Sequence, residues 1–144
     1  MKVLLDTNVI LDVWLAREPF WRDSAKLLGK VEGKEIQGVM CPTTITTLHY
    51  LGKKVLGEKK ARALLEDIIG ICEIGEISKK SFSSALESKV SDFEDAVIES
   101  VAHLMTVDYI ATRNLKDFRR SKVEAQEPSF FLQGEPIAGA DQTR

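Results

Sequence analysis

Short apolar runs separated by longer amphipathic stretches set the pattern of this chain. The first run, residues 3–5, predicts a buried strand that ends abruptly at the polar residues Asp6, Thr7 and Asn8. Further runs predict strands at residues 38–41, 72–77 and 109–112, with Val123 in a last edge strand. Continuous apolar runs bounded by polar or turn residues are typical of strands that are covered on both faces.

Apolar residues spaced three and four positions apart predict helices between these strands. We expect helices at residues 9–16, 20–33, 43–55, 58–69, 78–90 and 92–104, with helical turns at 114–118 and 128–132. Phe20 and Trp21 are expected on the buried face of the second helix. Ser91 and Glu94 have the spacing of a capping box that would open the sixth helix.

Alternating strands and helices predict an α/β fold in three layers, α/β/α, with a central, mostly parallel sheet of four to five short strands. We expect one domain over residues 1–132. Residues 133–144 are rich in glycine, proline and polar residues, and we expect them to form a mobile C-terminal tail.

Composition adds few constraints. The 144 residues carry a formal net charge of -2, so the whole chain is not a basic coat for nucleic acid. Cys41 and Cys72 lie in apolar contexts without metal-ligand spacing, which predicts buried free thiols. No leader pattern opens the sequence and no apolar run is long enough to span a membrane. We therefore expect a cytoplasmic protein that is not bound to a membrane.

Acidic residues follow the predicted strands at equivalent positions. Asp6 leaves the first strand, Asp95 lies in the first turn of the sixth helix, and Asp117 follows the strand at 109–112. In a parallel sheet these positions meet at one edge, where ligands bind. Asp92, Asp95 and Glu99 also share one face of a helix. Oxygen ligands without a cluster of histidine or cysteine favour Mg²⁺ or Mn²⁺.

Each of these acids has a structural alternative. Asp6 and Asp117 are good caps of a helix or a turn, and Glu94 has the capping-box role. Asp12 and Glu99 have the positions of solvated helix charges, and His49 that of a partly buried histidine.

With these residues assembled, the sequence resembles the PIN-domain nucleases, and it is similar to the toxin ribonucleases of bacterial and archaeal toxin–antitoxin pairs. The resemblance runs from Leu4 to about Leu132. Its motifs are Leu5-Asp6-Thr7-Asn8-Val9-Ile10-Leu11-Asp12, Asp92-Phe93-Glu94-Asp95-Ala96 and Asp108-Tyr109-Ile110-Ala111-Thr112-Arg113-Asn114-Leu115-Lys116-Asp117-Phe118.

The resemblance implies an endoribonuclease that hydrolyses RNA phosphodiester bonds with water activated by Mg²⁺ or Mn²⁺. Asp6, Asp95 and Asp117 would be its catalytic metal ligands, with Asp92 or Glu99 as a further candidate. The residues that would hold the first loop or position RNA and water are Asn8, Thr112, Arg113, Asn114 and Lys116. A cognate antitoxin and a homodimer are the implied partners besides RNA.

Basic residues occur in two runs that an RNA backbone could contact. Arg113, Lys116, Arg119, Arg120 and Lys122 form the run beside Asp117, and Lys53, Lys54, Lys59 and Lys60 form the other. A solvated surface is the alternative for both runs.

One departure from the family concerns the helix at 43–55, where the family usually carries a glutamate. Here the segment from Gln37 to Gly57 holds no acid, and His49 falls roughly at that position. Either Glu94 or Glu99 substitutes, or metal binding is weaker, or the fold has kept little activity. A further alternative is a non-catalytic PIN-like binding or regulatory module with a degraded metal site. A haloacid dehalogenase-type phosphohydrolase is a weaker alternative, because its second aspartate is replaced here by Asn8.

Overall fold

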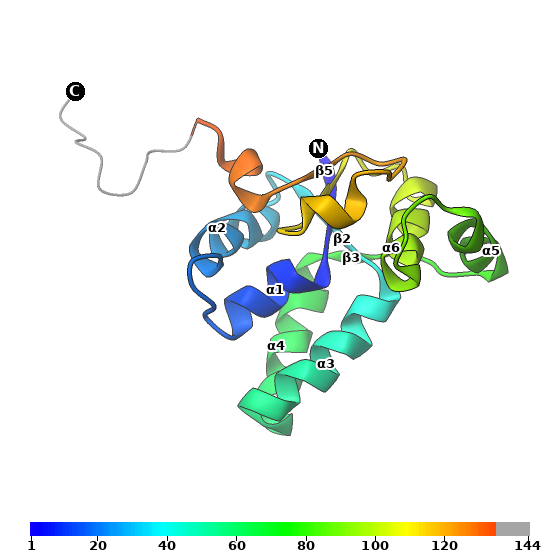
Figure 1. Cartoon of the computed structure of the whole chain (residues 1–144). Coiled ribbons are helices and arrows are strands. Elements are labelled where there is room, and N and C mark those ends of the chain that lie inside the picture. Colours follow the sequence, from blue (N-terminus) through cyan, green and yellow to red (C-terminus); the bar gives the residue numbers. More distant parts are fainter. Residues whose placement is uncertain (135–144) are drawn as a thin grey trace.

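The computed structural model describes residues 1–134 and shows a five-stranded parallel sheet covered by helices on both faces (Figure 1). The strands are β1 (Lys2–Leu5), β2 (Gln37–Met40), β3 (Glu73–Ile74), β4 (Tyr109–Ala111) and β5 (Ala125–Gln126). The α-helices are α1 (Thr7–Trp14), α2 (Trp21–Glu32), α3 (Pro42–Leu56), α4 (Glu58–Ile71), α5 (Lys79–Glu87) and α6 (Phe93–Leu104). Two 3₁₀ helices complete the fold, η1 (Leu115–Phe118) and η2 (Pro128–Leu132). The expected three-layer α/β/α fold is therefore confirmed.

The strand order is β3-β2-β1-β4-β5, and every neighbouring pair is parallel. β1 is central: Leu4 pairs with Val39 on one side and with Ile110 on the other. Because all five strands run the same way, the residues that follow them meet at one edge of the sheet.

Alternation along β1 assigns its residues to two hydrophobic cores. Leu4 belongs to the core under α5 and α6, whereas Val3 and Leu5 belong to the core under α1 to α4 and η2. Both cores are fully apolar around the strand, and all three of these residues are completely buried. This two-sided burial explains why the strands are short apolar runs rather than alternating polar and apolar residues.

Several local predictions differ from the structure. The N-cap of α6 is Asp92, whose side chain accepts a hydrogen bond from the backbone N–H of Asp95 at 2.9 Å. The predicted capping box with Ser91 and Glu94 is therefore wrong by one residue. Phe20 precedes α2 and is 39% exposed, so it does not belong to the core.

The edge strands also differ from the prediction. β5 begins two residues after Val123, and β3 is only two residues long. Both lie at the margins of the sheet, where one side of the strand has no partner and the apolar pattern is weakest.

The predictions for the cysteines, for membrane-spanning segments and for the C-terminal tail remain to be compared with the structure. Both cysteines are free thiols; burial raises the pKa of Cys72 to about 12. Among the described residues, no helix has the length and apolar character needed to cross a membrane. The tail predicted at 133–144 lies outside the described residues from residue 135 onward.

Candidate functional site

Asp6 is the first residue after the central strand, and the fold buries it to 5% exposure. One of its carboxylate oxygens accepts the backbone N–H of Thr7 at 2.8 Å, so Asp6 does cap α1. The other oxygen accepts hydrogen bonds from the hydroxyl of Thr112 at 2.8 Å and from the amide of Asn8 at 3.1 Å. The first and fourth strands are thus joined at their carboxyl ends by one carboxylate.

Burial is the main influence on the ionisation of Asp6. It raises the pKa of this carboxyl group, although the hydrogen bonds from Thr112, Thr7 and Asn8 act in the opposite direction. The carboxylate of Glu94 raises it further. A buried carboxyl group whose pKa is shifted from its ordinary value is a common feature of functional sites.

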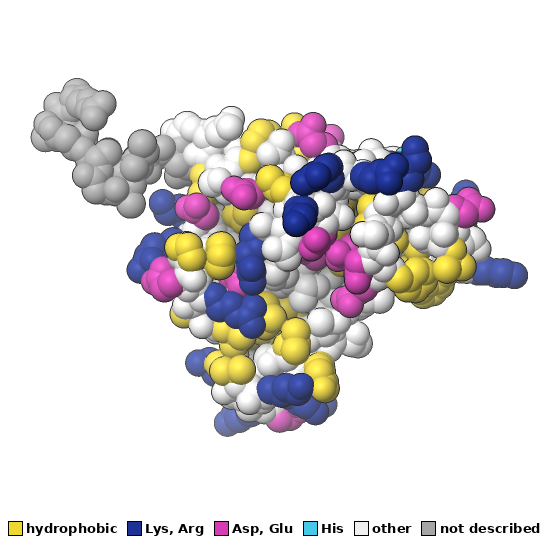
Figure 2. All heavy atoms as spheres, in the orientation of Figure 1, with side chains coloured by type: hydrophobic (Ala, Val, Ile, Leu, Met, Phe, Trp, Pro, Cys, Tyr) yellow, Lys and Arg dark blue, Asp and Glu magenta, His cyan; other side chains and the backbone are white. Residues whose placement is uncertain are grey.

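Asp95 lies in the first turn of α6 and faces the same edge of the sheet. Loss of solvent raises the pKa of Asp95 to about 7, and the next causes in order are the charges of Asp6, Asp92, Asp117 and Glu94. These five side chains form what we call the carboxylate cluster. Figure 2 shows Asp and Glu side chains gathered in the hollow between the positions of α1 and α6, below η1.

The chemistry of this cluster fits a divalent cation. Within residues 1–134, no Lys or Arg forms an ion pair with any of its five carboxylates. Like charges held together without a counter-ion repel each other, and a bound Mg²⁺ or Mn²⁺ would remove that repulsion. In the same part of the chain, no three His, Cys, Asp or Glu side chains already stand in the geometry of a metal site.

Helix α3 contributes hydroxyl groups to this edge. Thr44 is completely buried, and its hydroxyl lies 3.0 Å from that of Thr7. His49 does not lie at the cluster: its Nε2 atom is 2.7 Å from a carboxylate oxygen of Glu58 on α4. The sequence offered no clear signal for the contact between Thr7 and Thr44.

Asp12 and Arg113 form a buried ion pair next to the cluster. Asp12 is completely buried, so the expectation of a solvated helix charge is wrong. Arg113 donates to its two carboxylate oxygens at 2.7 and 3.3 Å, and Arg17 approaches one of them at 3.5 Å. The guanidinium of Arg113 also lies 4.5 Å from the ring centre of Phe20. The predicted substrate-binding role of Arg113 thus competes with a structural one.

Glu99 is also buried, at 4% exposure, which contradicts its prediction as a solvated charge. One of its oxygens accepts the hydroxyl hydrogen of Ser88, and the other accepts the backbone N–H of Lys122 at 2.7 Å. Both oxygens are therefore engaged outside the carboxylate cluster, although sequence spacing places Glu99 one turn from Asp95.

The other predicted site residues lie around Asp6 and Asp117. Asn8 and Thr112 hold the carboxylate of Asp6, and the backbone N–H of Asn114 donates to the hydroxyl of Thr112 at 3.1 Å. Asn114 and Lys116 are exposed beside Asp117. The structure thus brings the strand exits and the start of α6 together. Of the two acids considered as substitutes for the missing glutamate, Glu94 acts on Asp6 and Asp95, whereas Glu99 is engaged elsewhere.

Comparisons with known proteins bear on the family and on the fold. The family model described as "PIN domain" matches residues 2–116. No curated protein matches this chain in sequence. Among solved structures, VapBC2 from Rickettsia felis bound to a promoter DNA fragment has a TM-score of 0.70 at 18% identity, over 88% of this chain and 98% of that one.

Two other solved structures are similar. A toxin–antitoxin complex from Klebsiella pneumoniae has a TM-score of 0.66 at 25% identity, over 88% of this chain and 97% of the other. VapC20 from Mycobacterium tuberculosis, described as a toxin that cleaves the sarcin–ricin loop, has a TM-score of 0.62 at 13% identity. That match covers 75% of this chain and 86% of VapC20.

Proposed function

This chain belongs to the PIN-domain family, and from that premise we propose that it is a divalent-metal-dependent endoribonuclease, the toxin of a toxin–antitoxin pair. The observation that carries the proposal is the buried carboxylate of Asp6, held between the ends of β1 and β4 by Thr112, together with Asp95 at the start of α6. The pKa of Asp95 is raised by burial and, in addition, by the charges of Asp6 and Asp117. The cleavage of RNA by VapC20, a structural neighbour, supports the choice of substrate.

We propose that Asp6, Asp95 and Asp117 hold Mg²⁺ or Mn²⁺. Asp92 or Glu94 supplies the negative charge of the glutamate that the family usually carries on α3 and that this chain lacks. A divalent cation bound there lowers the pKa of water and stabilises charge on the attacked phosphate. Thr112 and Asn8 keep the carboxylate of Asp6 in one orientation through the hydrogen bonds described above.

The test is cleavage of a labelled single-stranded RNA in the presence of Mn²⁺ or Mg²⁺. Asp6→Asn should lower the cleavage rate by about two orders of magnitude or more, because one ligand charge is lost while the acceptor for Thr112 remains. Glu66→Gln is the matched control, since Glu66 is an exposed acid on α4 away from the cluster. Full activity of a folded Asp6→Asn protein would contradict the proposal.

The second candidate is a binding module with no catalytic activity, and the absence of acids between Gln37 and Gly57 favours it. Calorimetric titration with Mn²⁺ separates the two candidates. The nuclease proposal expects binding to the wild type that Asp95→Ala abolishes. If the wild type binds no Mn²⁺ at millimolar concentration, the binding module is the better description.

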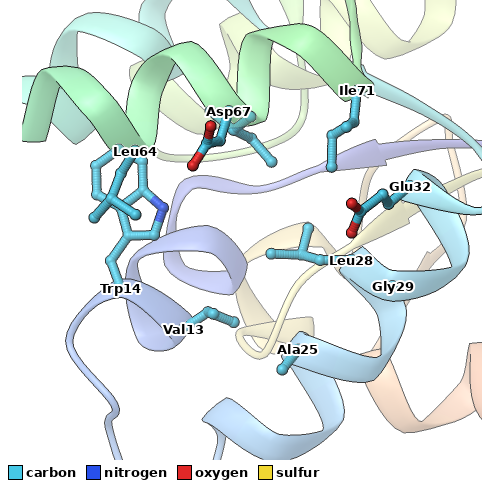
Figure 3. Close-up of a pocket in the computed structure, with 10 residues that line it drawn as sticks. Val13, Trp14, Ala25, Leu28, Gly29, Glu32, Leu64, Asp67 and Ile71 are labelled. Atoms are coloured by element: carbon cyan, nitrogen blue, oxygen red, sulfur yellow. The ribbon is translucent and has the colours of Figure 1, made fainter.

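A groove on another face supports a protein partner. It has a volume of about 510 Å³ and lies between α1, α2 and α4. Its lining consists of Val13, Trp14, Ala25, Leu28, Gly29, Glu32, Leu64, Asp67, Ile68 and Ile71. Figure 3 shows the carboxylates of Glu32 and Asp67 pointing into the groove from its two walls.

An apolar groove with an acidic rim suits an amphipathic helix that carries a Lys or Arg beside its apolar face. We propose that an antitoxin docks here with such a helix. The toxin–antitoxin complexes among the structural neighbours support a partner of this kind.

A further inference from the structure

The carboxylate of Glu99 connects two segments that are far apart in the sequence. Through Ser88 it holds the stretch that leads to Asp92, the N-cap of α6. The hydroxyl of Ser88 in turn accepts the backbone N–H of Val90 at 3.0 Å. Glu99 also accepts a hydrogen bond from the backbone N–H of Lys122, at 2.7 Å, and so holds the stretch that follows Asp117. A buried carboxylate that accepts two hydrogen bonds is a strong fixed point, since charge-assisted hydrogen bonds exceed neutral ones in strength.

The segment fixed at Lys122 is densely cationic. Lys116, Arg119, Arg120 and Lys122 are all exposed, and none of the four forms an ion pair with another described residue. We call residues 116–122 the cationic arm. Figure 2 shows Lys and Arg side chains gathered at and beside the position of η1, above the Asp and Glu side chains.

We infer that Glu99 is a positioning residue, which fixes the cationic arm as the surface that binds the phosphates of single-stranded RNA beside the carboxylate cluster. This inference rests on the proposed function in one respect: the choice of RNA as the nucleic acid comes from there. Unpaired cations at a fixed spacing bind a phosphate backbone without first being ordered. Phe118, which is buried in the core, anchors the first part of the arm. Without Glu99 the cationic residues after Phe118 keep their charges but lose their second anchor, and the cost of ordering them when RNA binds weakens binding.

The net charge makes this inference testable, because two effects predict opposite results. Glu99→Ala removes a negative charge, so electrostatics alone would strengthen the binding of RNA. A positioning role predicts weaker binding. Glu99→Gln keeps the size of the side chain and one carbonyl acceptor, so it should restore part of the affinity.

The experiment measures fluorescence anisotropy of a labelled single-stranded RNA of mixed sequence at several salt concentrations, in EDTA and without divalent metal. We expect Glu99→Ala to weaken binding by roughly three- to tenfold, with Glu99→Gln between it and the wild type. Arg119→Ala combined with Arg120→Ala should reduce the slope of log affinity against log salt by about 1.4, at about 0.7 for each cation removed. Lys79→Ala combined with Lys80→Ala, two exposed lysines at the start of α5 that belong to neither basic run, is the matched control and should leave the slope unchanged.

Four results would overturn the inference. If the Glu99→Ala variant binds RNA as well as or better than the wild type, Glu99 is not a positioning residue. An unchanged slope in the Arg119 and Arg120 variant, or no binding by the wild type, removes the arm as the RNA surface. Circular dichroism verifies folding; if Glu99→Ala does not fold, Glu99→Gln decides, and wild-type affinity in that variant overturns the inference.

The outcomes separate this inference from the proposed function. Metal-dependent cleavage that Asp6→Asn abolishes, together with arm variants that bind normally, contradicts only the inference. Binding that depends on the arm and on Glu99, without metal-dependent cleavage, contradicts only the proposed function.

Discussion

Asp95 illustrates at the scale of one residue how burial, together with the neighbouring carboxylates, opposes the stability of the fold. Its pKa of about 7, against 3.8 for an ordinary aspartate, means that the folded protein disfavours the charged form. Below pH 4 the group is protonated in both the folded and the unfolded chain, so it costs nothing. The cost grows as the pH rises from about 4 to 7 and is complete above 7.

Asp95→Asn should therefore stabilise the protein in the absence of divalent metal. We expect a gain of about 1 to 2 kcal/mol in the free energy of unfolding at pH 8, after allowing for solvent screening of a half-buried group, and little change at pH 4. Denaturant unfolding at the two pH values measures it. Glu87→Gln, at an exposed acid on α5, is the control. Equal stability of Asp95→Asn and wild type at pH 8 would show that neither burial nor the neighbouring carboxylates disfavour the charged form of Asp95.

At the scale of secondary-structure elements, the apolar pattern is sufficient to predict the sheet and the main helices. The carboxylates at the strand exits follow from that arrangement, because Asp6 directly follows one predicted strand and Asp117 lies in the short turn after another. Contacts between distant elements do not follow. A charge on an amphipathic helix normally faces water, so nothing near Asp12 or Glu99 in the sequence indicated their burial.

The pair between Asp12 on α1 and Arg113 after β4 is the clearest of these contacts, since 101 positions separate the two residues. Arg113→Ala would leave a fully buried carboxylate with only Arg17, at 3.5 Å, to balance it. We expect a loss of about 2 to 4 kcal/mol in the free energy of unfolding, somewhat less than for a buried charge left without any partner. Thermal and denaturant unfolding measure this loss.

Arg17→Ala is the matched control for that substitution. The side chain of Arg17 is 41% exposed, and its removal should cost less than about 1 kcal/mol. If Arg113→Ala is instead as stable as the wild type but binds RNA poorly, Arg113 contacts the substrate, as the resemblance to the family implies.

At the scale of the whole molecule, the groove and the carboxylate cluster lie in different parts of the fold. The groove is formed by α1, α2 and α4, whereas the cluster lies at the ends of β1 and β4 and at the start of α6. A substitution can therefore block the proposed partner without touching the proposed catalytic residues. Gly29 offers the means, because a Cβ atom added there meets no other atom within 4 Å.

Gly29→Leu should fill the groove and weaken the binding of the antitoxin by about tenfold or more, while cleavage of RNA continues. The probe is the antitoxin proposed above, with affinity measured by calorimetry. Gly70→Leu is the matched control: Gly70 is an exposed helical glycine of α4, outside the groove, with equal space around it. Equal affinity of both variants would place the partner elsewhere on the molecule.

The order of residues in the groove and in the cluster has a consequence for synthesis on the ribosome. All residues that line the groove lie between positions 13 and 71, whereas the cluster needs Asp95 and Asp117. A growing chain exposes the surface proposed for the antitoxin before it can assemble the site proposed to cut RNA. Under the proposed function, an antitoxin already present in the cell would therefore find its docking surface on each new chain before that chain has its complete carboxylate cluster.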